Sequence, residues 1–306
     1  MEIKQLREGE LSLVRVKGIE LLDVGKTFDC GQCFRFDEVQ NSKHRVEYAG
    51  VAFGRHVSFA QDGDELYIYN CDEDDFFDVW SRFLALDMDY AEINRDILSR
   101  SAGTVMDDAM EYGRGIRILR QDPFEATVSF IISQNNNIPR IKKIIESLCE
   151  CCGKPIVGIE GSENLLLHSS GRSSMMSFPS RDAIAELGEE GLYGLRVGFR
   201  AKYINDAMLR LGEGSLALDS VSEAENTSEC IDALCAVKGI GLKVASCIAL
   251  FGMGRYDAFP VDVWMKRVGE KYFSADPAEF SAERFGKYAG IAQQYLFYYE
   301  RYHGGK

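Results

Sequence analysis

The spacing of apolar residues changes once along this chain of 306 residues, and that change limits the possible folds more than any other feature. Up to about residue 70 the pattern is short and strand-like, and after it the apolar residues recur at helical spacing. Polar turns separate the strand-like stretches, which predicts an antiparallel sheet. The stretches are FRFDEV (34–39), HRVEYAGVAFGRHVSFAQ (44–61) and ELYIYN (65–70).

The part of the chain with helical spacing contains recognisable boundaries. Asp122-Pro123 has the pattern of a helix start, with proline in the first turn. The segment 158–180 is rich in Ser and Gly and is expected to be a loop. A sheet followed by helices is an α+β arrangement. We therefore expect a sheet domain with flanking helices over residues 1–116 and a helical domain over residues 117–306.

The charge of the chain is acidic but unevenly distributed. There are 35 Lys and Arg against 48 Asp and Glu, a formal net charge of −13. This balance excludes a protein that coats DNA by charge, because neutralising phosphates requires clustered cations. Residues 62–78 alone supply −8, whereas residues 134–143 and 196–203 each carry +3. If the protein binds DNA, the acidic segment is expected to face away from it.

From the cysteines and the hydropathy we expect a cytoplasmic protein. Nine cysteines are an odd number without the regular framework of a secreted fold, which predicts free thiols in a reducing compartment. Cys30 with Cys33, and the group 149–152, lack the second pair or nearby His that a closed metal site needs, so no metal is expected. No stretch approaches 18 uncharged apolar residues, so no membrane partner is expected.

A glycine pair points to a helical hairpin. Gly239 and Gly241 bracket one apolar residue between two apolar helical segments, so residues 232–252 predict two helices joined by a tight turn. The backbone amides at the start of the second helix can bind a phosphate. Because such binding uses backbone dipoles, it needs little side-chain charge and suits an acidic protein. A G-x-G alone, however, is more often an ordinary turn.

A lysine and an aspartate near the hairpin are candidates for catalytic residues. Lys243 lies in the first turn of a helix that then runs almost uncharged for ten residues. An apolar environment favours the neutral amine that nucleophilic attack requires, although a lysine there can also extend its charge into solvent. Asp262 follows Pro260 at the expected N-cap of the next helix. A carboxylate there could also orient or deprotonate Lys243 and stabilise positive charge on a sugar.

With these residues the chain resembles the helix-hairpin-helix DNA glycosylases that have a glycine/proline-rich loop and a trailing aspartate. Within that superfamily it looks like the 8-oxoguanine DNA glycosylase/AP lyase family. The resemblance covers nearly the whole chain and implies a two-lobed helical domain. Six motifs carry it in order: GQCFRF (31–36), SFIISQNNNIPRI (129–141), LYGLRVGFRAKY (192–203), VKGIGLKVASC (237–247), FPVDVW (259–264) and YAGIAQQYLF (288–297).

The resemblance implies a bifunctional base-excision repair enzyme that acts, without an organic cofactor, on duplex DNA containing 8-oxoguanine opposite cytosine. A monomer is expected, because each enzyme acts on one lesion. Lys243 would displace the base through an imine with the sugar, β-elimination would nick the strand, and Asp262 matches the essential aspartate. Two alternatives stay open: a glycosylase of the same superfamily for an alkylated purine, and a non-catalytic DNA-binding module. Lys243 argues against a monofunctional glycosylase, and the combination of Lys243 with Asp262 argues against a non-catalytic DNA-binding module.

The resemblance also assigns a base pocket, because chemistry on a base inside a duplex requires its extrusion. Cys247 and Phe297 would sandwich the purine, and Gln293 would read its Watson–Crick edge. A shift of one residue would give that role to Gln294. The carbonyl of Gly31 would accept from the N7–H group that oxidised guanine has and guanine lacks.

The remaining implied contacts are with the DNA around the extruded base. Trp264 stands where many relatives have His, so a phosphate contact there would be weakened or rebuilt through the indole N–H. The other contacts are Asn135, Arg140 and Arg200 with the estranged cytosine, Phe199 as a wedge in the base stack, and Gly239 and Gly241 with phosphate.

Overall fold

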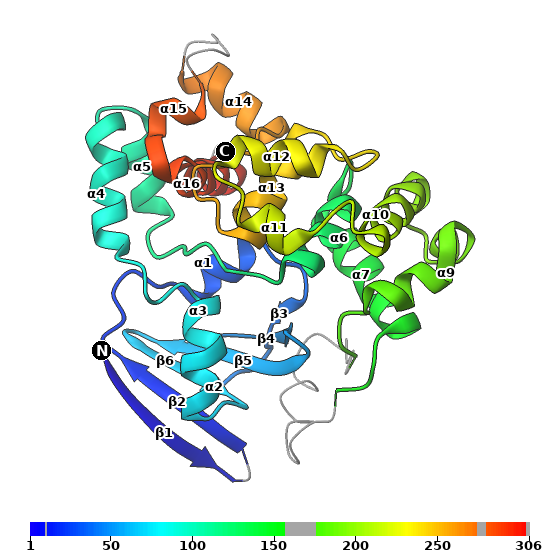
Figure 1. The fold of residues 1–306 in the computed structure, drawn as a ribbon. Helices are drawn as coiled ribbons and strands as arrows, with labels where there is room; N and C mark the ends of the chain where they lie inside the picture. Colours follow the sequence, from blue (N-terminus) through cyan, green and yellow to red (C-terminus); the bar gives the residue numbers. More distant parts are fainter. Residues whose placement is uncertain (10, 157–175, 274–279, 304–306) are drawn as a thin grey trace.

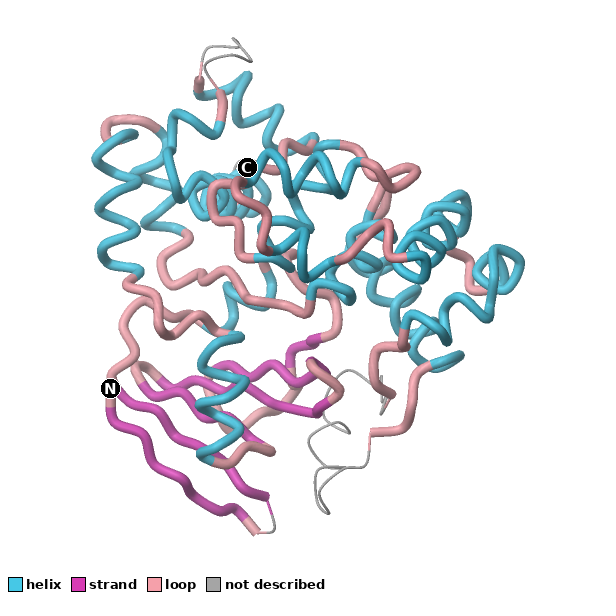
Figure 2. The backbone as a smooth tube through the Cα atoms, viewed as in Figure 1, coloured by secondary structure: helices cyan, strands magenta, loops and turns pink. Residues whose placement is uncertain are grey.

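The computed structural model describes residues 1–9, 11–156, 176–273 and 280–303. Within them an antiparallel sheet is followed by a helical layer, so the expected α+β class is confirmed (Figures 1 and 2). The sheet has the order β1-β2-β6-β5-β4-β3, and every neighbouring pair is antiparallel. Its strands are β1 (Glu2–Glu8), β2 (Leu11–Lys17), β3 (Phe36–Glu38), β4 (Val46–Ala52), β5 (Arg55–Asp62) and β6 (Glu65–Tyr69).

Short helical segments cover one face of this sheet (Figure 1). Phe59 of β5 packs edge-on against Trp80, with ring centroids 5.6 Å apart, and both rings are fully buried. The helical spacing predicted beyond about residue 70 is confirmed here, but the helical run that begins at Glu73 ends at Phe83 and the chain turns at Ala85, which has a φ of +51°. The segments in this region are α1 (Val24–Asp29), α2 (Glu73–Asp75), the π-helix η1 (Phe76–Trp80) and α3 (Ser81–Phe83).

The remaining described residues are mainly helical. The expected helix start at Asp122 is confirmed, because its side chain caps the helix that begins with Pro123. The helices are α4 (Tyr90–Ser101), α5 (Val105–Tyr112), α6 (Pro123–Ser133), α7 (Ile138–Cys152), α9 (Arg181–Gly194), η2 (Gly198–Arg200), α10 (Ala201–Glu213), α11 (Leu218–Ser222), α12 (Thr227–Cys235), α13 (Leu242–Met253), α14 (Val263–Tyr272), α15 (Ala282–Phe285), η3 (Gly286–Tyr288) and α16 (Ala289–Tyr302).

Helix α13 is the central element of the helical domain. It packs against α6 and α12, while α16 packs against α5 and α14. Every residue from Val244 to Gly252 is buried. This burial explains the almost uncharged sequence after Lys243, because an unpaired charge at these positions would be costly.

Two polar side chains fix the sheet domain to the helices. The buried guanidinium of Arg117 donates to the carbonyls of Glu20 (2.9 Å) and Ala85 (2.6 Å). Gln32 donates to the Arg117 carbonyl at 2.8 Å and accepts from the Leu119 amide at 2.8 Å. The segment around Gln32 is therefore held rigidly beside the helical domain. The domain boundary at residues 116 and 117 stays a prediction.

Several other expectations can be compared with the structure. All nine cysteines are free, as predicted. Most of the expected loop 158–180 falls on residues outside the described ranges. Among the helices that are described, none has both the length and the apolar composition needed to cross a bilayer.

Candidate active site

The predicted hairpin is confirmed, with α12 ending at Cys235 and α13 beginning at Leu242. Gly239 has a φ of +84°, and a Cβ atom there would lie 2.3 Å from the ring of Tyr203. The carboxylate of Asp206 accepts from the Lys238 amide at 2.9 Å. Tyr203 and Asp206 both belong to α10, so this helix supports the turn of the hairpin.

Lys243 and Cys247 lie one turn apart on α13 and line the same cavity. Lys243 is half-buried, whereas Cys247 is buried. Burial raises the pKa of the Cys247 thiol, and the nearby Lys243 opposes that effect. Cys247 is therefore a neutral thiol at physiological pH and offers an apolar, polarisable surface.

Asp262 caps α14 as predicted. Its Oδ1 atom accepts from the backbone amides of Trp264 and Met265, both at 2.9 Å. Both bonds use the same oxygen, and no bond from Oδ2 to another described residue is present. Because the helix N-terminus stabilises a negative charge, the carboxylate is held in place while one oxygen stays available to the cavity that it lines.

The cavity has a volume of about 250 Å³ and brings together residues from five separate parts of the chain. Its walls come from the segment before β3, from the end of α6 and the start of α7, from α13, from the start of α14, and from α16. None of the acidic residues 62–78 lines it, and Figure 1 shows β6 in the lower part of the molecule, away from α12, α13 and α14. The predicted residues that line it are Gly31, Lys243, Cys247, Asp262, Trp264, Gln293 and Phe297.

Gly31 forms a wall with little room for a side chain. It has a φ of +81°, which disfavours any residue with a Cβ atom. A Cβ there would lie 3.2 Å from Ile138, 3.4 Å from Arg301 and 3.8 Å from Phe297. The backbone of Gly31 is thus brought close to α16 and to the space beside Phe297.

The two adjacent glutamines of α16 have different environments. Gln294 donates to the carbonyl of Cys30 at 2.9 Å, so it supports the segment that carries Gly31. The Oε1 atom of Gln293 is buried and has no hydrogen-bond partner among the described residues. Gln293 is 4% exposed and lines the cavity. Gln294 lines the cavity as well, but of the two only Gln293 has a fully buried side-chain oxygen without a partner among the described residues.

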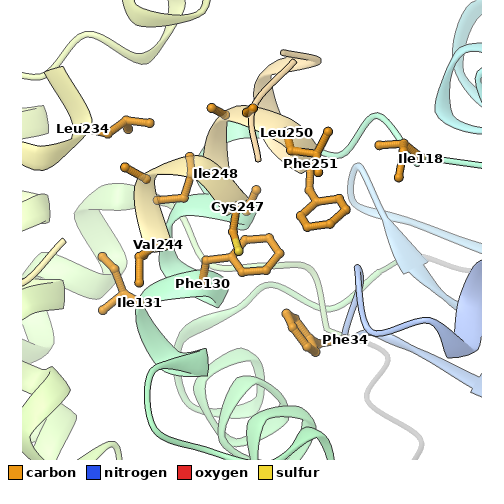
Figure 3. Close-up of a cluster of buried hydrophobic side chains, with 14 of the residues drawn as sticks. Phe34, Ile118, Phe130, Ile131, Leu234, Val244, Cys247, Ile248, Leu250 and Phe251 are labelled. Carbon is orange, nitrogen blue, oxygen red and sulfur yellow. The ribbon is translucent and has the colours of Figure 1, made fainter. Parts of the chain in front are cut away.

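Three aromatic rings form one side of the cavity, and the sequence did not single them out. The rings of Phe130 and Phe251 are stacked with centroids 5.3 Å apart, and Phe34 meets Phe130 edge-on at 5.7 Å. Figure 3 shows these rings grouped beside the Cys247 side chain. Phe251 lies four residues after Cys247, so helical spacing could have identified it. No local pattern pointed to Phe34 or Phe130, although both lie within quoted motifs.

The other predicted DNA contacts lie outside this cavity. Asn135 and Arg140 are exposed, and Asn135 has a left-handed φ of +47°. The side chain of Phe199 is 42% exposed, and the Arg200 guanidinium stacks over its ring at 4.5 Å. Phe199 also packs edge-on against Tyr203, which contacts Gly239. The proposed wedge and the hairpin are therefore connected through one tyrosine.

Arg200 is less accessible than its predicted role suggests. It is only 3% exposed, and its guanidinium donates to the carbonyls of Gln134 and Asn135. Burial, together with repulsion by Arg140, lowers its pKa. In this structure Arg200 holds the Asn135 turn. Contact between Arg200 and an estranged cytosine stays a prediction.

Trp264 lines the cavity, and a cation lies over its ring. The guanidinium carbon of the exposed Arg267 lies 4.9 Å from the centre of the Trp264 ring system. A cation held on an indole face is a suitable partner for an anion. Position 264 thus offers the cavity an indole with an arginine beside it.

Comparison with known proteins gives a consistent result. Residues 15–127 match a family model described as the N-terminal domain of 8-oxoguanine DNA glycosylase, and residues 128–286 match the HhH-GPD superfamily of base excision DNA repair proteins. The N-glycosylase/DNA lyase OGG1 of Arabidopsis thaliana is 30% identical, over 89% of this chain and 75% of its own length.

Two solved structures have the same fold over nearly the whole chain. One is the 8-oxoguanine glycosylase/lyase of Clostridium acetobutylicum in complex with double-stranded DNA containing cytosine opposite 8-oxoG. It is 37% identical, has a TM-score of 0.85 and covers 98% of each chain. The other is MBOgg1 in complex with a low-affinity DNA ligand, which is 39% identical, has a TM-score of 0.85 and covers 100% of each chain.

Proposed function

This chain belongs to the 8-oxoguanine DNA glycosylase family, and from that membership we propose that it removes 8-oxoguanine paired with cytosine from duplex DNA and then nicks the strand. The observation that supports this most directly is the content of the cavity. A lysine and a capped carboxylate, Lys243 and Asp262, share it with an unpaired acceptor on Gln293. An adequate explanation of this site must use all three.

The proposed reaction begins with the neutral amine of Lys243. Its lone pair attacks C1′ of the damaged nucleotide, the bond from C1′ to N9 breaks, and the bonding electrons leave with the base, which takes up a proton. Asp262 stabilises the positive charge that develops on the sugar. Ring opening gives an imine between Lys243 and C1′. Loss of a proton from C2′ then expels the 3′ phosphate and breaks the strand.

The same cavity provides the proposed recognition of the base. Cys247 and Phe297 cover the two faces of the purine, and Gln293 reads its Watson–Crick edge. The carbonyl of Gly31 accepts from N7–H of the lesion. In guanine, N7 carries a lone pair instead, so the two acceptors would face each other. An unpaired buried acceptor costs about 1–3 kcal/mol, which favours the oxidised base.

The surface outside the cavity would hold the rest of the DNA. Phe199 would fill the gap that the extruded base leaves, since stacking on a ring replaces part of the lost contact. The hairpin amides after Gly239 and Gly241 would bind phosphate, with Trp264 supplying a further contact. Asn135, Arg140 and Arg200 would face the cytosine left behind.

Three further proposals concern organisation. The enzyme acts as a monomer, because one lesion occupies one cavity. It works in the cytoplasm, on the nucleoid when it is engaged with DNA. Residues 1–116 supply the Gly31 wall of the site, and residues 117–306 supply the chemistry.

Borohydride trapping tests the proposed function. The protein is incubated with duplexes that carry 8-oxoguanine opposite each of the four bases, and borohydride reduces any imine to a permanent adduct. We expect an adduct for wild type, most of it opposite cytosine, and none for Lys243→Gln. Lys4→Gln is the matched control, because Lys4 is exposed on β1 and lies outside the cavity.

Each alternative predicts a different result in this assay. An adduct only with duplexes that carry an alkylated purine would favour the other glycosylase. Tight binding without any adduct would favour a DNA-binding module. An undiminished adduct in Lys243→Gln would refute the assigned nucleophile.

A further inference from the structure

The proposed chemistry leaves one cationic residue of the cavity without a role. Arg301 lies on α16, four residues after Phe297 and eight after Gln293, so the three side chains leave successive turns on one side of the helix. All three line the cavity. The Nη1 atom of Arg301 lies 3.4 Å from the position that a Cβ atom would take at Gly31. Arg301 thus stands beside the backbone that is proposed to recognise the lesion.

Arg301 and Gln293 both present unpaired polar atoms. Nη1 of Arg301 is buried and has no hydrogen-bond partner in the described parts of the chain, and the same holds for Oε1 of Gln293. Buried polar atoms in proteins are nearly always paired, and each exception requires an explanation. One donor and one acceptor left unpaired in the same cavity indicate a ligand with an acceptor and a donor of its own.

We propose that Arg301 is a specificity-determining residue that donates a hydrogen bond to the C8 carbonyl oxygen of 8-oxoguanine. This inference rests on the proposed function. In the lesion, N7–H and C8=O are adjacent, and in the protein the Arg301 donor lies beside the backbone of Gly31, whose carbonyl is the proposed acceptor. The pair of protein groups therefore matches the pair of base groups. Guanine has neither base group, because its N7 carries a lone pair and its C8 carries a hydrogen.

The order of groups along the purine favours the oxygen on C8 over the oxygen on C6. From the Watson–Crick side, the edge presents C6=O, then N7–H, then C8=O. Gln293 and Arg301 are eight residues apart, about 12 Å along the helix. With Gln293 on the Watson–Crick edge and Gly31 on N7–H, the group nearest to Arg301 is C8=O.

A donor at this position also assists departure of the base. When the bond from C1′ to N9 breaks, the negative charge that develops on N9 is shared with the oxygen on C8 by resonance. A cationic donor on that oxygen becomes stronger as the charge grows, and such an interaction lowers the barrier. Arg301 should therefore affect the rate of base release and have little effect on the later strand cleavage.

The first test separates base release from strand cleavage. Arg301→Met retains the apolar stem and removes the donors, and Arg95→Met on the exposed face of α4 is the matched control. Each enzyme is assayed in excess over an 8-oxoguanine:cytosine duplex, and separately on a duplex with a preformed abasic site. We expect base release by Arg301→Met to fall on the order of 10- to 100-fold, with cleavage at the abasic site unchanged. Arg95→Met should match wild type in both assays.

The second test identifies the atom on the base. In 8-thioguanine the C8 oxygen is replaced by sulfur, a weak acceptor, while N7–H is kept, and 6-thio-8-oxoguanine makes the same change at C6. If Arg301 binds the C8 oxygen, wild type and Arg301→Met should release 8-thioguanine at nearly the same rate. The full difference between them should persist with 6-thio-8-oxoguanine.

Three results would overturn the proposal. One is an equal effect of Arg301→Met on 8-oxoguanine and 8-thioguanine. Another is a difference that disappears with 6-thio-8-oxoguanine, which would assign the contact to C6. The third is loss of abasic-site cleavage in Arg301→Met, which would give Arg301 a structural role. Failure of the proposed function is distinct from all three, because wild type itself would then form no borohydride adduct.

Discussion

The turn of the hairpin offers the sharpest test of how this site is built, because two glycines two residues apart have opposite requirements. Gly239 has a φ of +84°, and a Cβ atom there would lie 2.3–2.5 Å from three ring atoms of Tyr203. Gly241 has an extended backbone, and a Cβ there would have nothing within 4 Å. Replacing each glycine by alanine adds the same methyl group to opposite environments.

The expected magnitudes follow from these contacts. Alanine at a left-handed φ costs about 1–2 kcal/mol. The Tyr203 ring must also move from 2.3 Å to beyond the 3.4 Å at which ordinary contact begins, and overpacking of this kind costs about 1–3 kcal/mol. Gly239→Ala should therefore lower the free energy of unfolding by about 2–5 kcal/mol. Gly241→Ala loses only a favourable N-cap residue, and its cost should stay below about 1 kcal/mol.

Urea unfolding of both variants measures this difference, and a third protein separates its two causes. In the double variant Gly239→Ala/Tyr203→Ala the ring is absent, so the Gly239 change should then cost only its backbone strain and no longer the steric clash. The double variant should therefore lose less stability than the two single changes added together. Equal stabilities for Gly239→Ala and Gly241→Ala, or strict additivity with Tyr203→Ala, would refute this account of the turn.

Two further predictions concern groups near the cavity and the domain junction. Gln294→Ala leaves the Cys30 carbonyl without its donor, so thermal unfolding should show a loss of about 1–3 kcal/mol, whereas Gln293→Ala removes no such bond and should lower only the excision of 8-oxoguanine. Burial raises the pKa of Glu125 to about 7 in the folded protein, so folding takes up a proton. The favourable contribution of Glu125 to the free energy of unfolding is therefore full below about pH 4.5 and is lost as the pH rises through 7. Urea unfolding should therefore show that, from pH 5 to pH 8, the free energy of unfolding of wild type falls by about 1–3 kcal/mol relative to that of Glu125→Gln. The same pH dependence in both proteins would contradict this assignment.

Sequence periodicity predicted the elements of this fold better than their ends. The alternation in residues 44–61 gave the central strands, and Asp122-Pro123 gave the start of α6, because both signals are local. The helical spacing after residue 76 did not reveal the break at Ala85. That residue adopts a left-handed conformation although alanine favours helices, so the surrounding structure, and not the local sequence, decides the turn.

The places of some cavity residues could be predicted from local spacing, whereas those of Gly31, Gln293 and Phe297 came from the family resemblance, and the roles of all of them stay predictions. Lys243 and Cys247 follow from helical spacing, and Asp262 follows from capping, so their places were expected. The environment of Arg200 was not expected, because it depends on two carbonyls more than sixty residues earlier in the chain. A sequence motif names the residue type at such a position, but it does not say which groups the side chain already binds.

The role of the sheet domain in the site follows from two bonds at opposite ends of one short segment. Gln294 of α16 holds the carbonyl of Cys30, and Gln32 is fixed to the backbone of residues 117 and 119. Gly31 lies between these two anchors, so its backbone cannot move independently of either domain. Helix α16 therefore does two things at once: Gln293 faces the cavity, and Gln294 sets the position of the opposite wall. A change that loosened this connection would alter the width of the cavity without touching Lys243 or Asp262, and it should affect the choice of base before it affects strand cleavage.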